Sequence, residues 1–199
     1  MKLLYLGNTN NKLFEYLNEN TSLTSTQNKI NKDFAIKFDF IVSFGYRHII
    51  KKDVINLFQY NNIVNLHVSY LPYNRGADPN LWSILDNTQS GITIHLIDSN
   101  LDTGDILLQK KVALDFENDT LKSSYEKLQN EIIVLFIENW NLIKNNKIKP
   151  IKQNHSIKTF HCLKNRPNEN IIMPQGWDTK IFDVKKLYIS HIIDSQNKI

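Results

Sequence analysis

Cysteine is almost absent from this 199-residue sequence, and Cys162 is its one example. One cysteine excludes an intramolecular disulfide and a cysteine-based zinc site, which fits a reducing cytoplasm. The sequence also lacks an apolar run long enough to cross a bilayer. Its first residues, MKLLYLGNTN, show no cleavage site for a signal peptide and predict a strand. We therefore expect a cytoplasmic protein with no membrane partner.

No charge of either sign dominates the sequence. Lysine and arginine number 24 against 20 aspartate and glutamate residues, which gives a net charge of +4 with neutral histidine. A scattered excess of this size is weak evidence for nucleic-acid binding and fits an anionic small substrate equally well. Hydrophobic residues make up 41% of the chain, which is typical of a soluble globular protein. We therefore expect one folded domain with no nucleic-acid partner.

The order of the expected elements is typical of an α/β fold. Short apolar runs indicate strands, and apolar residues at three-to-four spacing indicate helices. In chain order we expect strands at 2–6, 38–45, 62–68, 91–98 and 104–114, and helices at 11–19, 51–59, from Pro79 onward and at 119–146. Asp78 is expected to cap the helix that begins at Pro79. Residues 21–37 are ambiguous.

The last two strands are expected to pair as an antiparallel hairpin on an otherwise mostly parallel sheet. Pro150 ends the longest helix. Beyond it the apolar periodicity is lost. The chain is therefore expected to divide into a core at 1–150 and a small, loop-rich C-terminal extension at 151–199.

Two polar side chains stand out in the stretch NLHVSYLPYNRG, residues 65–76. Side chains alternate between the two faces of a strand, so Asn65 and His67 point one way while Leu66 points to the core. They lie near the carboxyl end of the strand, where open α/β sheets place their ligand sites. An Asn N–H can bond an oxyanion, and a His can move protons at neutral pH. The alternative is that both side chains only satisfy loop carbonyl groups.

A carboxylate is expected to join them. Asp102 lies in the turn NLDTGD between the hairpin strands, and such a turn can return to the same part of the sheet. There Asp102 can orient and charge a histidine. An amide, an imidazole and a carboxylate together suit acyl transfer. Ser69 and Thr103 are near, but neither lies in a G-x-S-x-G elbow, so we expect the nucleophile to belong to the substrate, such as an amine.

A metal site is an open alternative for the same stretch. Asp102 and Asp105, with His67 or His95, supply suitable ligand types. Their spacing matches no strong metal motif, and we expect no metal.

The residues from Asn65 to Val112 resemble the core of the folate-dependent formyltransferases. The motifs that match are Asn65-x-His67, Ser69-x-Leu71-Pro72, Arg75-Gly76, Gly91-x-Thr93-x-His95 and Leu101-Asp102-x-Gly104. The stretch is most similar to the small N-formyltransferases that act on nucleotide-linked amino sugars. The resemblance implies a Rossmann-like formyltransferase core, with 10-formyltetrahydrofolate as the formyl donor.

The resemblance also implies roles for individual residues. Asn65 and a protonated His67 would stabilise the oxyanion, while Asp102 would hold and charge His67 and help to remove a proton from the amine. The residues that would line the folate pocket are Tyr46, Arg47, His48, Ile49, Asp98 and Leu101. The residues that would contact the sugar nucleotide are Arg75, Gly76 and Trp82. Alternatively, Arg47 and His48 lie in an exposed loop, and Trp82 faces the core.

The resemblance leaves the acceptor amine open. We expect a thymidine-linked 4-amino- or 3-amino-6-deoxyhexose that enters a surface polysaccharide such as the O-antigen of lipopolysaccharide. Glycinamide ribonucleotide is disfavoured because the first turn, GNTNN, has one glycine where several would cradle a phosphate. Transfer RNA is disfavoured because only about 50 residues follow Pro150. A formyltetrahydrofolate hydrolase and an inactive ligand-binding module stay alternatives, and a homodimer is left open.

Overall fold

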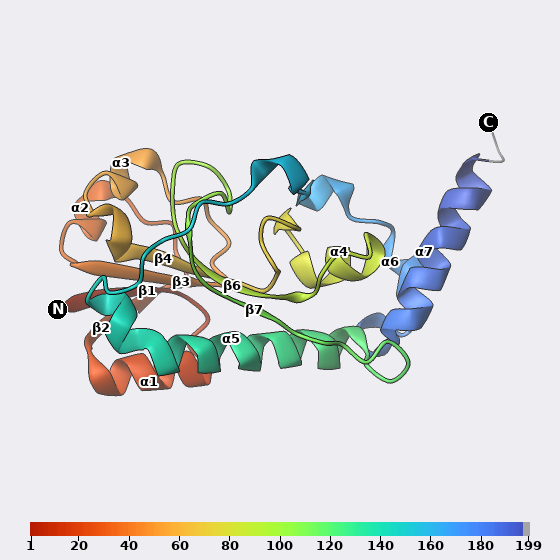
Figure 1. Cartoon of the computed structure of the whole chain (residues 1–199), viewed down its shortest axis with the longest axis horizontal. Coiled ribbons are helices and arrows are strands. Elements are labelled where there is room, and N and C mark those ends of the chain that lie inside the picture. The colour runs from red at the N-terminus through yellow and green to blue at the C-terminus, as the bar shows by residue number, and fades with distance from the viewer. Residues whose placement is uncertain (197–199) are drawn as a thin grey trace.

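A six-stranded sheet forms the centre of the structure, a computed structural model that describes residues 1–196 (Figure 1). In spatial order its strands are β2 (Ser22–Thr26), β1 (Lys2–Gly7), β3 (Phe40–Phe44), β4 (Ile63–His67), β6 (Gly91–Leu96) and β7 (Ile106–Lys111). The first four strands run parallel, and β6 is antiparallel to both β4 and β7. The predicted Rossmann-like sheet, mostly parallel with an antiparallel hairpin, is confirmed.

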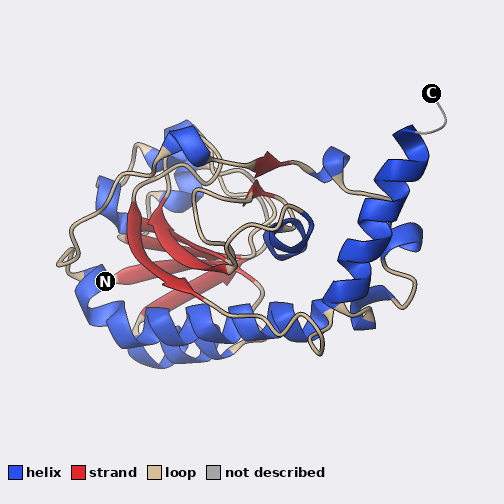
Figure 2. Ribbon diagram, turned by 45° about the vertical axis from the view of Figure 1, so that its right-hand side comes forward, coloured by secondary structure: helices blue, strands red, loops and turns tan. Residues whose placement is uncertain are grey.

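Two helices cover one face of this sheet, as Figure 2 shows from the side. Helix α1 (Lys12–Asn20) and helix α5 (Leu121–Lys144) pack there against strand residues such as Val42 and Leu66. Helix α5 begins where Thr120 accepts a hydrogen bond from the Ser123 N–H at 3.1 Å, which satisfies one of the free donors of its first turn. The main apolar core therefore lies between the sheet and α5.

The opposite face is apolar at one end and polar at the other. Two short helices, α2 (Lys32–Ala35) and α3 (Lys52–Ile55), pack over an apolar cluster that includes Ile41 and Ile63. The ambiguous stretch 21–37 contains β2 and α2. Strand β2, of sequence SLTST, forms the edge of the sheet and is at most half-buried, so it needs no apolar run.

Two local expectations were wrong. The helix expected at 51–59 ends at Ile55, and a 3₁₀ turn, η1 (Tyr60–Asn62), leads into β4. Asp78 precedes helix α4 (Pro79–Leu85) but its side chain caps no helix N–H, because its backbone is left-handed with φ of 51°. Its carboxylate lies instead 3.2 Å from the side chain of Arg166.

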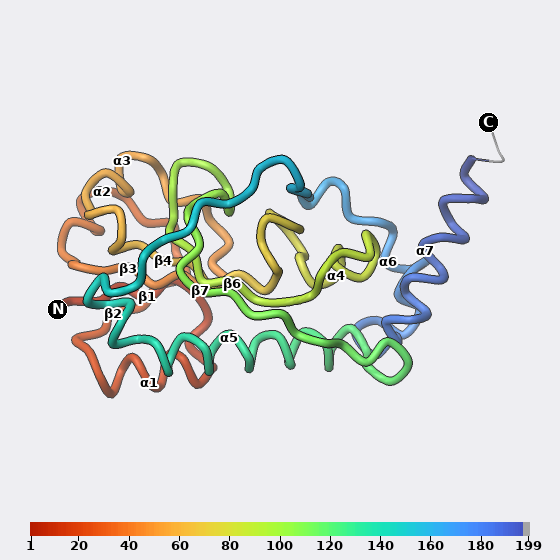
Figure 3. The backbone as a smooth tube through the Cα atoms, viewed as in Figure 1, coloured from red at the N-terminus to blue at the C-terminus, as the bar shows by residue number. Residues whose placement is uncertain are grey.

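The chain after Pro150 first returns to the sheet and then leaves it (Figure 3). Ile151 pairs with Ile106, and the short strand β8 (Phe160–His161) pairs in parallel with β5 (Arg75–Gly76). We call residues 151–161 the return segment. The elements in and beyond it are η2 (His155–Ile157), η3 (Leu163–Asn165), α6 (Glu169–Ile172), η4 (Gly176–Asp178) and α7 (Ile181–Gln196).

Helix α7 corrects the prediction of a loop-rich extension. Its periodicity is blurred because Ile181 and Val184 are buried near its start, whereas Phe182, Ile189 and Ile193 are exposed on other sides. Neither this helix nor any other within residues 1–196 has the length and apolar character needed to span a membrane.

Candidate active site

Asn65 and His67 lie on the sheet face opposite α5. Between them Leu66 turns the other way and packs in the core. Strand β4 is flanked by β3 and β6, in a register that places Asn65 opposite His95. His67 is buried and Asn65 is half-buried. The predicted alternation of side chains along this strand is therefore confirmed.

Asp102 reaches both side chains from the turn between β6 and β7. Its Oδ2 lies 3.8 Å from Nδ1 of His67, and its Oδ1 lies 3.5 Å from Nδ2 of Asn65. The backbone N–H of Gly76 donates to Oδ2 at 2.8 Å. Gly104 closes the turn against β6, where any Cβ would collide with the carbonyl oxygen of Leu96. The turn thus holds the carboxylate over the predicted site.

His67 has two distinct ring nitrogens. Its Nε2 donates to the carbonyl oxygen of Asn74 at 3.0 Å, because a carbonyl can only accept. The other nitrogen, Nδ1, therefore faces Asp102, and 3.8 Å is too long for a hydrogen bond. Nδ1 is the atom of the ring that can exchange a proton with a substrate.

His95 fixes the amide of Asn65. Its Nδ1 donates to the Leu96 carbonyl at 2.8 Å, which leaves Nε2 as an acceptor. Nδ2 of Asn65 donates to this Nε2 at 3.1 Å. One amide hydrogen is thus committed to His95. The second points toward Asp102 across 3.5 Å, at the limit of a hydrogen bond, and is therefore available to a stronger acceptor.

Burial and charge set the protonation of the site in opposite senses. Burial lowers the pKa of His67 below its ordinary value, and the facing carboxylate of Asp102 offsets this only in part. Burial alone would raise the pKa of Asp102, but His67, His95 and the Gly76 N–H hold that pKa below its ordinary value. The resting site therefore combines an ionised carboxylate with a neutral His67, whereas the resemblance implies a protonated one.

The loop after β3 presents the first group of predicted folate residues. The Tyr46 hydroxyl donates to the Asn28 carbonyl at 2.7 Å, and His48 packs edge-on against Tyr46 with ring centres 5.3 Å apart. Arg47 and His48 are exposed, and Ile49 is 72% exposed. Exposure is what both the pocket and the bare-loop interpretation expect, so the folate contacts stay a prediction.

The loop after β6 presents the second group. Asp98 accepts from the Thr103 hydroxyl at 2.6 Å and from the Asn100 N–H at 3.0 Å, so its carboxylate shapes the turn that carries Asp102. Leu101 is 45% exposed at the tip of that turn. A direct folate contact of either residue stays a prediction.

The residues predicted to contact the sugar nucleotide differ in what they can reach. Arg75 is buried, and its guanidinium donates to Gln153 and to Nδ1 of His155, so it is not free in solvent for a diphosphate. Gly76 has φ of +93°, and a Cβ there would collide with the His161 carbonyl. Its structural task is to bring its N–H to Asp102.

Trp82 is 4% exposed and belongs to the apolar cluster of α4. The imidazole of His161 stacks flat on its indole at 3.7 Å. This geometry favours the alternative in which Trp82 faces the core, and a substrate contact of Trp82 stays a prediction.

Metal ligation finds little support in this geometry. Within residues 1–196, no three histidine, cysteine or acidic side chains converge as a metal site would require.

Comparison with known proteins places this geometry in a family. Residues 10–138, more than half of the chain, match the model of the formyl transferase family. The chain belongs to the formyl transferase family. The formyltransferase PseJ from Anoxybacillus kamchatkensis, solved in complex with UDP-4,6-dideoxy-4-formamido-L-AltNAc and tetrahydrofolate, is 41% identical, with a TM-score of 0.86. That match covers 94% of this chain and 100% of PseJ.

Other members of the family are more distant or longer. An N-formyltransferase from Helicobacter canadensis, 21% identical with a TM-score of 0.73 and coverage of 94% of this chain and 80% of that one, shares the fold. Methionyl-tRNA formyltransferase from Fusobacterium nucleatum is 37% identical over 123 residues. That match takes in 61% of this chain and 39% of the relative. The chain spans about half of the length of the curated relatives it matches.

Two residues of the site, His95 and Gln153, were not predicted from the sequence to belong to it. His95 was named as a motif residue and as a possible metal ligand but was given no role in the site, although its place two residues after Thr93 on a strand is a signal for a shared face. Gln153 binds the Asp102 turn from a stretch without periodicity, and the contact joins residues 51 positions apart. No local sequence pattern predicts a contact over this separation.

Proposed function

We propose that this chain transfers a formyl group to the amine of a nucleotide-linked amino sugar. The observation that carries the proposal is the convergence of Asn65, His67 and Asp102 on one sheet face, in a chain 41% identical to PseJ over all of that protein's length. PseJ was solved with a formamido sugar nucleotide and tetrahydrofolate, the two kinds of molecule that such a transfer involves.

The proposed donor is 10-formyltetrahydrofolate. Its pterin ring system has broad faces and polar edges, and it would lie between the loop that carries Tyr46 and Ile49 and the turn that carries Leu101. Both loops expose apolar side chains, and Tyr46 and Ile97 pack against one apolar cluster. Solvent-exposed Ile49 and Leu101 would be covered by the bound donor, which is a reason for their exposure.

In the proposed reaction the amine nitrogen of the sugar attacks the formyl carbon, and the carbonyl electrons move to its oxygen. The amide hydrogen of Asn65 that is not bonded to His95 donates to this oxyanion. Nδ1 of His67 takes the proton that the amine loses, and the new imidazolium is stabilised by Asp102 beside it. The same proton then passes to the donor nitrogen as its bond to the formyl carbon breaks.

This mechanism assigns His67 a neutral resting state. Its lowered pKa keeps the ring unprotonated near pH 7, so Nδ1 has a free lone pair and the charge appears only after attack. Asp102 therefore stabilises a charge that is absent in the substrate complex and appears only as the reaction proceeds. Such stabilisation lowers the activation barrier of formyl transfer without tightening substrate binding.

For the acceptor we propose a 4-amino-6-deoxyhexose on a nucleoside diphosphate. The sugar nucleotide bound to PseJ carries its formamido group at position 4 of a 4,6-dideoxy sugar and is linked to uridine, which favours uridine over the thymidine expected from the sequence. A destination in a surface polysaccharide, a homodimer, and the division of the chain at Pro150 stay predictions.

Two other acceptors keep some support. The sequence similarity to methionyl-tRNA formyltransferases makes a charged transfer RNA the second candidate. Water is a third, because Asn65, His67 and Asp102 could equally serve the hydrolysis of the donor.

The proposal is tested with purified protein, 10-formyltetrahydrofolate and a panel of acceptors. The panel holds uridine- and thymidine-linked 4-amino and 3-amino sugars, glycinamide ribonucleotide, methionyl-tRNA and a control without acceptor. Mass spectrometry should find one added formyl group on a nucleotide sugar, with the highest kcat/KM of the panel. A higher kcat/KM for either non-sugar amine, or equal donor loss without any acceptor, would overturn the choice of acceptor.

A further inference from the structure

A buried glutamine of the return segment, Gln153, has every polar atom of its side chain bonded. Its Oε1 accepts from Nε and Nη2 of Arg75, at 3.2 and 2.5 Å. Its Nε2 donates to the carbonyl oxygens of Asp102 at 3.0 Å and of Gly104 at 2.7 Å. Gln153 is buried, so breaking any of these hydrogen bonds would leave a buried polar atom unpaired. The side-chain amide therefore fixes the guanidinium on one side and the two carbonyl groups on the other.

On one side Gln153 bonds to the turn that carries Asp102, and the backbone of this turn is strained. Asp102 has φ of 53°, in the left-handed region that a residue other than glycine enters at about 1–2 kcal/mol. Such a conformation persists when its surroundings hold it. The two bonds from Nε2 of Gln153 hold the peptide groups that follow Asp102 and Gly104, and the Asp102 carboxylate extends from that same turn toward His67.

On the other side Gln153 bonds to Arg75, the residue before Gly76, whose N–H binds this carboxylate. Gly76 donates to Oδ2 of Asp102 at 2.8 Å, and Arg75 precedes it in β5. Strand β5 pairs with β8 at the end of the return segment, with Arg75 N donating to the Thr159 carbonyl at 3.1 Å. Both partners of the Asp102–Gly76 bond are therefore anchored to one segment of chain.

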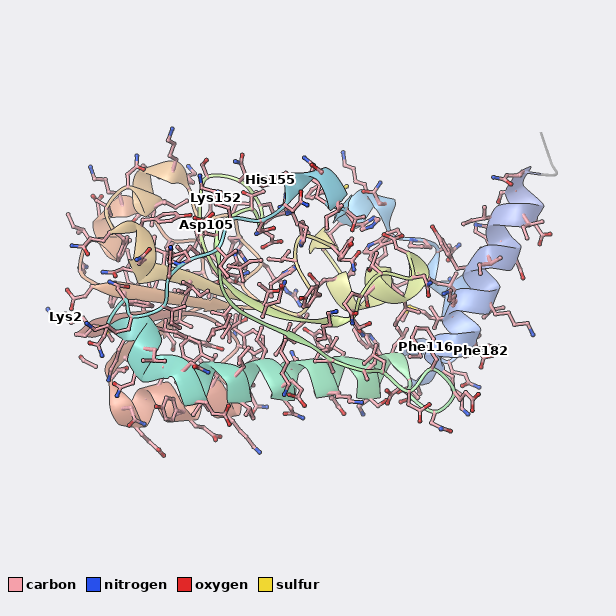
Figure 4. The ribbon with its side chains drawn as sticks, viewed as in Figure 1. Lys2, Asp105, Phe116, Lys152, His155 and Phe182 are labelled. Carbon is pink, nitrogen blue, oxygen red and sulfur yellow. The ribbon has the colours of Figure 1, made fainter. Side chains whose placement is uncertain are left out.

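The return segment also reaches the partner of His67. The Thr159 hydroxyl accepts from the N–H of Asn74 at 2.7 Å and donates to its side-chain oxygen at 3.1 Å. The carbonyl of the same Asn74 accepts from Nε2 of His67. Figure 4 shows the segment, labelled at Lys152 and His155, crossing the same side of the sheet as the turn labelled at Asp105.

We propose that Gln153 is a positioning residue that holds the Asp102 carboxylate against His67, so that the return segment completes the active site. The inference rests on the proposed function, in which Asp102 stabilises the charge that His67 acquires. A displacement of a reacting group by about 1 Å can cost up to about 100-fold in rate. Loss of the two donor bonds is therefore expected to lower kcat by about 10- to 100-fold and to leave KM nearly unchanged.

The sharpest variant is Gln153→Glu. A carboxylate keeps an acceptor for the buried Arg75, so the fold retains that contact, but it has no N–H for the carbonyls of Asp102 and Gly104. Gln153→Leu removes both the acceptor for Arg75 and the donor for the two carbonyls. It is therefore the variant that destabilises the fold more. Ser156→Ala, on the same segment with an exposed side chain, is the matched control and should keep wild-type kcat.

A double-variant cycle separates positioning from general loosening. In the Asp102→Asn background, Gln153→Glu should cost less than about 2-fold in kcat, because the group it positions is already gone. An equal cost in both backgrounds would mean that Gln153 acts independently of Asp102 and would overturn the proposal. So would a kcat within about 2-fold of wild type for folded Gln153→Glu.

A measurement without substrate keeps this inference distinct from the proposed function. The groups that face His67 are Asp102, His95, Arg75 and the Asn74 carbonyl. Of the three charged or titratable ones, Asp102 alone raises the pKa of His67. An NMR titration of the His67 ring in Gln153→Leu should therefore give a lower pKa than in wild type, even if no acceptor is ever formylated. An unchanged or higher pKa would contradict the positioning role.

Discussion

Asn65 and His95 face each other across two antiparallel strands, with the Asn65 amide nitrogen 3.1 Å from Nε2 of His95. The Leu96 carbonyl determines which His95 nitrogen holds the proton, and His95 in turn determines which way the Asn65 amide points. The orientation of the Asn65 amide is thus set by the backbone carbonyl of Leu96, the residue that follows its strand partner His95. A donor fixed before the reaction costs no reorganisation during it.

His95→Leu should lower kcat by about 10-fold, since the Asn65 amide loses the acceptor that orients it. Asn65→Ala should lower kcat by at least about 100-fold, the scale of a lost oxyanion donor. Steady-state kinetics of the two single variants and the double variant test the link. The double variant should be no slower than Asn65→Ala, whereas multiplied effects would show that His95 acts by another route.

Asp102→Asn should lower kcat and move the acidic limb of the pH–rate profile to lower pH. The carboxylate raises the pKa of His67, so its removal lets burial depress that pKa further. Folate binding, followed by fluorescence quenching, should be retained. A limb that stays in place would mean that another group controls the acidic side.

The free energy of unfolding should fall as pH decreases from about 6.5. The unfolded chain binds a proton at His67 near 6.5 and at Asp102 near 3.8, while the folded chain resists both because the two pKa values are lowered. The unfolded state therefore binds more protons over both ranges, and stability is lost on acidification. Urea denaturation across pH should show a smaller loss just below pH 6.5 for His67→Gln. An identical slope for wild type and variant would contradict a lowered pKa of His67.

The placement of the site residues was predictable from the sequence to the extent that it depends on local patterns. Alternation along one strand places Asn65 and His67 on a common face, and a short turn between paired strands brings Asp102 back to it. The tautomer of His67 was not predictable, because it depends on the Asn74 carbonyl in a loop. The lowered pKa of His67 depends on burial, which the sequence pattern alone does not reveal.

The fold, too, was predictable only where its elements leave a local pattern in the sequence. Buried parallel strands such as β3 show as apolar runs, and α5 shows a periodic face, so both were predicted. Helix α7 was missed because it leaves apolar side chains exposed on several sides. The contacts of Gln153 and Arg75 were missed because they join segments distant in the sequence through polar groups that follow no period.

Gly76→Ala should destabilise the protein by more than about 3 kcal/mol, the combined scale of a left-handed backbone and an overpacked contact. The φ of +93° and the nearby His161 carbonyl leave no room for a methyl group. Gly176→Ala is the matched control, since its φ is +59° with no atom within 4 Å of the added Cβ. It should cost only about 1–2 kcal/mol. Equal losses in urea denaturation would contradict the close approach of β8 to Gly76.

The most direct test of the account compares wild type with His67→Asn in formyl transfer to a uridine-linked 4-amino-6-deoxyhexose, with both substrates saturating. His67 is expected to receive the proton of the amine, so its replacement should lower kcat by at least about 100-fold while the dissociation constants of folate and sugar nucleotide stay within a few-fold. Mass spectrometry of the formylated sugar over time gives kcat for both proteins. A folded His67→Asn variant that formylates the sugar at nearly the wild-type rate would contradict the account.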